Sequence, residues 1–186
     1  MSGPERRTQV LGIAADEFAD HGLHGASIDA IAHRAGITQA YVFRMFGTKK
    51  ALFLELVGAA FYRFTDGMAH AAEGTTGLDA LQRMGRQYYE SLADRTTLLL
   101  QLQGFAACGD DEVRALVRTR IARMWDTVTD TTGLDPVTVK SFLAFGMLLN
   151  NMAALDVDEL DEPWANGVRT RIRAGLFEHI TAATNR

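Results

Sequence analysis

The chain has 186 residues, of which 47% are hydrophobic and 23% are charged. This balance is typical of a globular protein and argues against a disordered or fibrous chain. The net charge of −4 argues against a protein that coats nucleic acid through its whole surface. The single cysteine cannot form an internal disulfide or a cysteine-rich metal site. We therefore expect a folded protein of one or two domains, without a metal or another cofactor.

Helix is the expected structure throughout, because the three prolines are widely spaced and no segment shows strand-like alternation of apolar and polar residues. Glycines and short polar clusters divide the chain, which predicts an all-α fold of about nine helices. Helices are expected at 6–20, 28–35, 39–46, 49–72, 137–155 and 164–183, and apolar faces with helical spacing at 78–92 and 113–128. No interruption of the helical pattern is expected between the glycine-containing polar clusters at 73–77 and 109–111. In two copies of Thr-Thr-Gly-Leu-Asp, Asp79 and Asp135 are expected to cap the helices that follow.

Residues 26–52 have the pattern of two short helices joined by a sharp turn. Ser27 and Thr38 stand where their side chains can cap these helices, and Gly36 suits the turn between them. Val42 and Phe46 fall on the inward row of the second helix. Its outward row consists of polar and aromatic side chains, namely Thr38, Gln39, Tyr41 and Arg44. This pattern predicts a helix-turn-helix.

The outward row of the second helix suits double-stranded DNA. The major groove is about 12 Å wide and admits an α-helix, while cations and helix N-termini contact the phosphates. The charged residues between 34 and 50 are all basic, namely Arg34, Arg44, Lys49 and Lys50. Thr48 adds a capped helix start beside the two lysines. The sequence therefore predicts DNA binding near its N-terminus.

Residues 10–56 resemble the DNA-binding domain of the TetR family. The matching segments lie at 10–22, 27–32, 35–38 and 42–52. The resemblance implies a three-helix DNA-binding domain at 1–48, followed by a helical effector-binding and dimerisation domain at 49–186. Two departures from the family pattern, Arg44-Met45-Phe46 and Lys49-Lys50, add positive charge.

The family pattern also implies which side chains face DNA. We transfer this pattern position by position and combine it with the outward row and the helix caps. The residues expected to contact DNA are then Ser27, Thr38, Gln39, Ala40, Tyr41, Phe43, Arg44, Thr48, Lys49 and Lys50. Two alternatives stay open. Phe43 could instead close the core of the three-helix domain, and Arg44 and Lys49 would be ordinary solvated charges outside a helix-turn-helix.

A homodimer is the expected assembly. The resemblance implies that the last two helices pair with those of a second copy as a four-helix bundle. The segment 137–155 independently requires extra burial, because it is apolar on nearly all sides and Lys140 is its one charged residue. The residues expected at the interface are Phe142, Gly146, Leu149, Ala153, Val168, Ile172 and Leu176. The alternative is that these residues form the core of a monomer.

The same segment could be mistaken for a membrane span, but Lys140, Ser141 and the adjacent Asn150 and Asn151 argue against insertion. The first residues show no apolar signal segment. We therefore expect a cytoplasmic protein without a membrane partner.

The resemblance further implies a cavity for a small-molecule effector in the second domain. Candidate lining residues are large and apolar or aromatic: Phe61, Phe64, Met68, Met84, Tyr88, Leu102, Phe105, Trp125 and Phe145. Tyr88, Gln101, Gln103 and Asn150 could orient the ligand through hydrogen bonds. The alternative for each of these residues is a place in an ordinary core.

These expectations together describe a transcriptional regulator, in the family most often a repressor, that binds a palindromic operator under the control of a small apolar or amphipathic ligand. An enzyme is not expected, because the five histidines form no metal-binding spacing and no phosphate loop or nucleophile motif occurs. The acidic run at 156–162 lacks the order of a calcium loop. The alternative function is a helical ligand-binding or scaffold protein that does not bind DNA.

Overall fold

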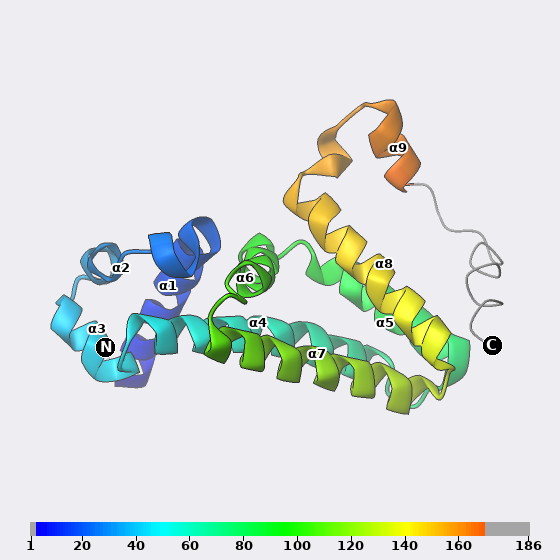
Figure 1. Cartoon of the computed structure of the whole chain (residues 1–186), viewed down its shortest axis with the longest axis horizontal. Helices are drawn as coiled ribbons and strands as arrows, with labels where there is room; N and C mark the ends of the chain where they lie inside the picture. Colours follow the sequence, from blue (N-terminus) through cyan, green and yellow to red (C-terminus); the bar gives the residue numbers. More distant parts are fainter. Residues whose placement is uncertain (1–2, 170–186) are drawn as a thin grey trace.

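The fold is all-α over residues 3–169, the part of the chain that the computed structural model describes (Figure 1). The helices are α1 Gly3–Gly25, α2 Ile28–Ala35, α3 Gln39–Phe46, α4 Lys49–Ala71, α5 Gly77–Ser91, α6 Arg95–Ala106, α7 Asp111–Thr132, α8 Pro136–Ala154, the short 3-10 helix η1 Val157–Glu159, and α9 Pro163–Arg169. The expected fold class is confirmed, and the described region contains nine α-helices.

Helix caps explain why α2 and α3 have the bounds that the sequence predicts. The side chains of Ser27, Thr38 and Thr48 each accept a hydrogen bond from a backbone N–H in the first turn of α2, α3 and α4. Gly36 ends α2 in the left-handed conformation, with φ of 65°. Local sequence therefore determines where these two helices begin and end.

The region between α4 and α7 differs from the prediction. The structure interrupts it between α5 and α6, where Asp94 caps α6 by accepting a hydrogen bond from the backbone N–H of Thr97. The predicted cap at Asp79 is wrong, because α5 begins earlier, with Thr76 at its cap position. The predicted cap at Asp135 is confirmed by its hydrogen bonds to the first turn of α8.

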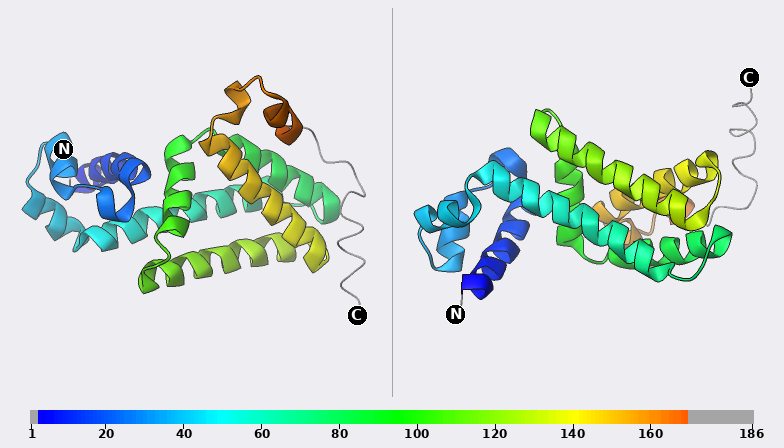
Figure 2. Two further views of the ribbon diagram at one scale, coloured as in Figure 1. Left: turned by 45° about the horizontal axis from the view of Figure 1, so that its top comes forward. Right: turned by 90° about the horizontal axis from the view of Figure 1, so that it is seen from below.

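Helix α4 connects the N-terminal helices to the rest of the fold. Helices α1–α3 form one end of the molecule, and α4 runs from there alongside α7 toward the other end (Figures 1 and 2). Aromatic pairs mark its contacts along the way: Phe18–Phe53 with α1, Phe61–Phe105 with α6, and Phe64–Tyr88 with α5, at ring separations of 5.3, 5.7 and 5.1 Å. One continuous core therefore links the two expected domains, and their boundary after residue 48 stays a prediction.

Helix α8 is less buried than its composition suggests. It is buried at Val139, Gly146 and Asn150, whereas Met147, Leu148 and Leu155 are exposed large hydrophobic residues on it or just beyond its end. Among the described helices, it is the one that is long and apolar enough to cross a membrane. The expected burial on several sides is not reached within residues 3–169, because α5, α6 and α7 pack against only part of its surface.

Candidate nucleic-acid interface

Helix α3 is held by its inner face and leaves its outer face open. Val42 is only 1% exposed, and Phe46 is half-buried beneath the guanidinium of Arg7, 4.9 Å from its ring centroid. Gln39 and Arg44, on the other side of α3, are exposed. The predicted inward and outward rows are therefore found where the sequence places them.

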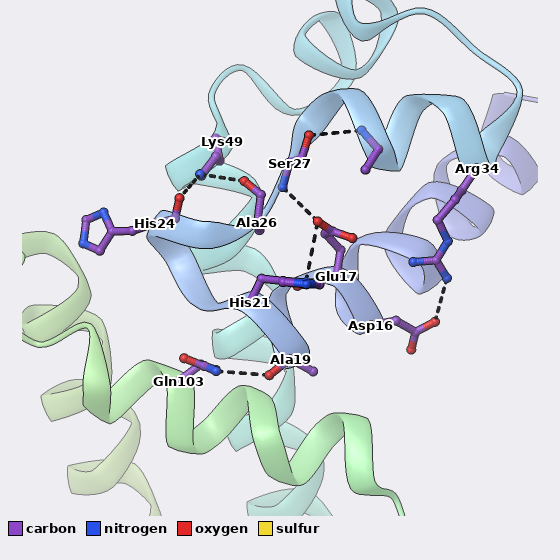
Figure 3. Close-up of polar contacts among 11 residues, drawn as sticks. Asp16, Glu17, Ala19, His21, His24, Ala26, Ser27, Arg34, Lys49 and Gln103 are labelled. Carbon is purple, nitrogen blue, oxygen red and sulfur yellow. Dashed lines mark hydrogen bonds and ion pairs between the residues drawn. The ribbon is translucent and has the colours of Figure 1, made fainter.

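A buried carboxylate fixes α2 relative to α1. Glu17 is 9% exposed, and its Oε1 atom accepts a hydrogen bond of 2.9 Å from the backbone N–H of Ser27 (Figure 3). The positive end of the α2 dipole also favours a carboxylate at this place. This role of Glu17 is not predicted from the sequence. Its position among the apolar residues of α1 is the signal that could have identified it.

Tyr41 and Arg44 form one unit on the surface of α3. The Arg44 guanidinium lies 4.6 Å from the centroid of the half-buried Tyr41 ring. Phe43 is 39% exposed, and Ala40 is exposed as well. Phe43 therefore lies at the surface of the three-helix domain and outside its buried core.

The helix-capping residues Ser27, Thr38 and Thr48 lie at the candidate interface. All three residues are exposed. Each stands at a helix N-terminus, where free backbone N–H groups and the helix dipole attract phosphate. Their placement supports phosphate contacts, which stay a prediction.

The ammonium of Lys49 joins α4 to the end of α1. Its Nζ atom donates hydrogen bonds to the carbonyl oxygens of His24, at 2.9 Å, and Ala26, at 2.7 Å (Figure 3). An ammonium has three N–H bonds, so one remains for the phosphate contact that the family resemblance implies. Lys49 also has a structural role, which the sequence analysis did not predict.

Lys50 points toward the other half of the molecule. Its Nζ atom forms ion pairs with Asp110, at 3.3 Å, and with Glu112, both at the start of α7. The hydrogen bond to Glu112, followed by that to Asp110, raises the pKa of Lys50. The backbone N–H of Val113, more than Lys50 itself, lowers the pKa of Asp110.

Intramolecular partners also limit which cations remain for DNA. Arg34 pairs with Asp16 at 3.4 Å, and Lys49 and Lys50 have the partners described above. Arg44 differs from these three residues of the 34–50 segment. Within residues 3–169, its guanidinium contacts an aromatic ring, whereas their charged groups contact oxygen acceptors. Among the four basic residues of this segment, we therefore expect Arg44 to be the most available to DNA.

The geometry of α1–α4 agrees with a family comparison. Residues 10–56 match the family described as bacterial regulatory proteins, tetR family. The N-terminal region of the chain therefore has the DNA-binding domain of the TetR family. This match covers α2, α3, most of α1 and the start of α4, which together carry the candidate interface.

Two curated regulators are similar to the TetR-like part of the chain. The HTH-type transcriptional activator FasR of Mycolicibacterium smegmatis is 35% identical over 80 residues, which is 43% of this chain and 36% of FasR. The uncharacterized HTH-type transcriptional regulator YdgC of Bacillus subtilis is 40% identical over 55 residues, or 30% of this chain and 28% of YdgC. The matches thus span well under half of either relative.

Solved structures of TetR-type regulators share the fold over most of the chain. PfmR from Thermus thermophilus has a TM-score of 0.67 at 18% identity, covering 87% of this chain and 93% of that one. FadR from Bacillus subtilis, solved in complex with stearoyl-CoA, has a TM-score of 0.67 at 15% identity, covering 87% and 95%. At these identities the similarity establishes the fold.

The second expected site lies in the body of the TetR fold, around a cavity of about 1340 Å³. Four of the nine predicted lining residues face this cavity: Phe61, Tyr88, Phe105 and Phe145. Trp125 lines a smaller hollow of about 580 Å³ on α6 and α7. The structure places the other four outside both: Phe64, Met68 and Met84 in the core, and Leu102 half-buried on α6. The spacing of large apolar residues in the sequence does not distinguish residues of a cavity wall from residues of a packed core.

Among the polar candidates, Gln101 and Asn150 also line the cavity. Gln103 does not, because it turns toward α1 and donates a hydrogen bond of 3.1 Å to the carbonyl oxygen of Ala19 (Figure 3). Leu98 also lines the cavity, from α6, although the sequence does not predict it there. Its single signal, a place in an apolar run, is shared with many core residues.

The residues expected at the dimer interface lie on the cavity side of α8. Phe142, Gly146, Leu149, Ala153 and, from α9, Val168 line the cavity, while Ile172 and Leu176 lie outside the described residues. The opposite side of α8 carries an exposed stripe, which we call the α8 outer face: Ala144, Leu148, Asn151 and, just past the helix, Leu155. Met147 is exposed as well, but it lines the cavity. An apolar helix gives no periodicity by which sequence alone could distinguish these two sides.

Proposed function

We propose that this protein is a transcriptional regulator that binds a two-fold-symmetric DNA operator as a homodimer and responds to a small molecule. The exposed side of α3, held outward by Val42 and presenting Gln39, Tyr41 and Arg44, is the observation that carries this proposal. A helix with one buried side and a polar outer side is what major-groove recognition requires.

The α8 outer face supports the homodimer. Leu148 on this face is exposed to 40%, although it lies in the most apolar long helix of the described chain. A second copy would cover both faces symmetrically, as an isologous contact. Two recognition helices could then read half-sites about 34–36 Å apart, one turn of DNA. This interface uses the opposite side of α8 from the one that the sequence favoured.

The position of α6 supports ligand control. Leu98, Gln101 and Phe105 lie on its cavity side. From the other side, Thr96 and Gln103 reach α1, where Thr96 donates a hydrogen bond of 3.2 Å to Asp16. A ligand that displaces α6 would therefore displace the DNA-binding helices as well. The FadR structure with stearoyl-CoA shows that a protein of this fold holds a small molecule.

The direction of regulation is a separate part of the proposal. We expect repression, the commoner action in the family, although the similar protein FasR is named an activator. A reporter gene placed behind the selected operator tests this part, because added protein lowers expression if it represses and raises it if it activates.

The DNA-binding part is tested by selecting bound sequences from a random pool with the purified protein. We expect a palindrome, with Gln39→Ala and Arg44→Ala each weakening binding about 5- to 150-fold through lost base contacts. Arg86→Ala on α5 removes an exposed arginine far along the chain from α3 and should bind like wild type.

The scaffold alternative makes a different prediction for the same measurement. Enrichment of no sequence, together with equal and negligible DNA binding by wild type and all variants, would contradict the regulator proposal. Retained ligand binding in that case would favour a helical ligand-binding protein.

A further inference from the structure

The inner wall of the 1340 Å³ cavity combines an apolar surface with a small group of uncharged polar side chains. Apolar residues from α4, α5, α6, α7 and α8 make up most of the lining. The polar side chains are Tyr88, Gln101 and Asn150, and all three are buried. A ligand in this cavity would therefore meet hydrogen-bonding groups at the inner end, hydrocarbon along most of the remaining wall, and charged side chains at the rim.

These three side chains form a chain of hydrogen bonds that ends on α4. The Tyr88 hydroxyl donates to Asn150 Oδ1 at 2.7 Å, and Asn150 Nδ2 donates to Gln101 Oε1 at 3.3 Å. Gln101 Nε2 then donates to the carbonyl oxygen of Ala60 at 3.3 Å. Burial raises the pKa of Tyr88, so its hydroxyl stays protonated and neutral.

Each member of the chain keeps hydrogen-bonding capacity for a ligand. The amides of Asn150 and Gln101 each have a second N–H, and the Tyr88 oxygen has lone pairs. A hydroxyl group can accept from an amide and donate to the tyrosine at once, and a carbonyl group can accept from an amide. None of these interactions compensates a full negative charge that is removed from water.

The two cations that line the cavity within residues 3–169 are already engaged. Arg95 donates to the carbonyl oxygens of Ala153 and Ala154 at the end of α8, and to Asp156 at 2.7 Å. Arg169 donates to three carbonyl oxygens between residues 157 and 160 and to the side chain of Asn166. Binding an anion would require either guanidinium to leave these acceptors.

The remaining charged groups of the described lining are acidic. They are the exposed carboxylates Glu90, Asp156, Asp158 and Glu159. With two arginines and four carboxylates, the rim carries a net charge of −2 from these described residues (2 − 4). An anionic ligand would therefore be repelled at the entrance and left without a counterion inside.

We infer that the cavity takes an uncharged amphiphile, an apolar chain or ring system whose hydroxyl or carbonyl group hydrogen-bonds to Tyr88 and Asn150. The inference rests on the proposed function, because it names the class of effector that would move α6. On this inference, the site distinguishes ligands mainly by their charge. It excludes fatty acids and phosphorylated lipids.

The test uses three probes with the same ten-carbon chain: decanol, decanoate and decylammonium. Titration calorimetry on the full chain without DNA measures each dissociation constant, and DNA affinity is measured separately, so a failure of DNA binding does not affect the result. We expect decanol to bind at least about tenfold more tightly than either ion. Tyr88→Phe removes one hydroxyl and should weaken decanol binding about two- to tenfold.

Two controls keep the result specific. Tyr62→Phe removes the hydroxyl of an exposed tyrosine on α4 outside the cavity lining and should leave decanol binding unchanged. Urea unfolding of Tyr88→Phe checks that the variant remains folded. If decanoate or decylammonium binds as tightly as decanol, if Tyr88→Phe binds decanol like wild type, or if decanol does not bind, the inference is overturned. Loss of decanoate binding in Arg95→Gln would point to an anionic ligand.

Discussion

Lys50 and Asp110 form an ion pair of 3.3 Å between Nζ and Oδ2, although 60 positions separate them in the sequence. The pair joins the first turn of α4, beside the candidate DNA-binding surface, to the start of α7. Glu112 contacts the same ammonium. If Lys50 contacts a DNA phosphate, as the sequence predicts, we expect the carboxylates of α7 to compete with DNA for its ammonium.

Removing that competition should strengthen DNA binding. In the double variant Asp110→Asn with Glu112→Gln, the Lys50 ammonium is released, while asparagine still caps α7. We expect tighter binding and a slope of log K against log salt that is steeper by about one, as for one added phosphate contact. Fluorescence anisotropy over a salt series measures both.

Lys50→Gln is the control for this effect. In that background the same double variant should no longer steepen the salt slope, because the released ammonium is absent. An unchanged slope in the presence of Lys50 would show that Lys50 does not reach phosphate.

Gly22 should be the most sensitive glycine of α1. Its φ is 65°, and a Cβ atom at this position would lie 2.6 Å from Oε1 of Gln103 on α6. We expect Gly22→Ala to lower the free energy of unfolding by about 1–3 kcal/mol. Gly12→Ala is the matched control in the same helix, since its Cβ meets nothing within 4 Å, and it should stabilise by about 0.5–1 kcal/mol. Urea denaturation compares them, and equal effects would contradict the close approach of α6.

The α8 outer face predicts how the homodimer can be broken. Leu148→Glu places a charge in the proposed contact and should weaken dimerisation by at least about 30-fold. Thr119→Glu, on the exposed surface of α7, is the control and should leave the dimer intact. Sedimentation at several protein concentrations measures the dissociation constant. A wild-type protein that stays monomeric and binds lipid vesicles would instead indicate that a membrane covers this face.

Asp135 should make folding stability depend on pH. The hydroxyl and backbone N–H of Thr138, and then the backbone N–H of Val137, lower the pKa of Asp135 below its ordinary value of 3.8. Because the folded pKa is the lower one, the ionised carboxylate stabilises the fold above pH 3.8, and this contribution is lost as the pH falls through the folded pKa. Asp135→Asn keeps a capping group but does not titrate, so its unfolding free energy should fall less on acidification. Urea titrations across that range measure the difference, and identical pH profiles would refute it.

Much of the candidate interface could be predicted because its signals are local. Ser27, Thr38 and Gly36 cap and turn the chain within a few residues, so the bounds of α2 and α3 follow from neighbours in the sequence. The outward row of α3 follows from helical period. The break before α6 was missed because its signal, the cap at Asp94, lies inside a region of continuous helical pattern.

The partners of the charged side chains could not be predicted in this way. Lys49 and Lys50 stand side by side, yet one donates to the end of α1 and the other pairs with α7. Sequence separation contains no information about which acceptors lie within hydrogen-bonding distance. The same reason explains Gln103, which was expected at the ligand and instead contacts Ala19.

The sequence by itself determined the all-α fold, the helix-turn-helix and its exposed face, since helix period, caps and glycine turns act over a few residues. Only the tertiary structure decided which side of α8 lines the cavity, which aromatic residues are core, and which cations remain for DNA. Those properties depend on how distant helices pack, and an apolar or charged side chain is compatible with several such arrangements until its neighbours are fixed.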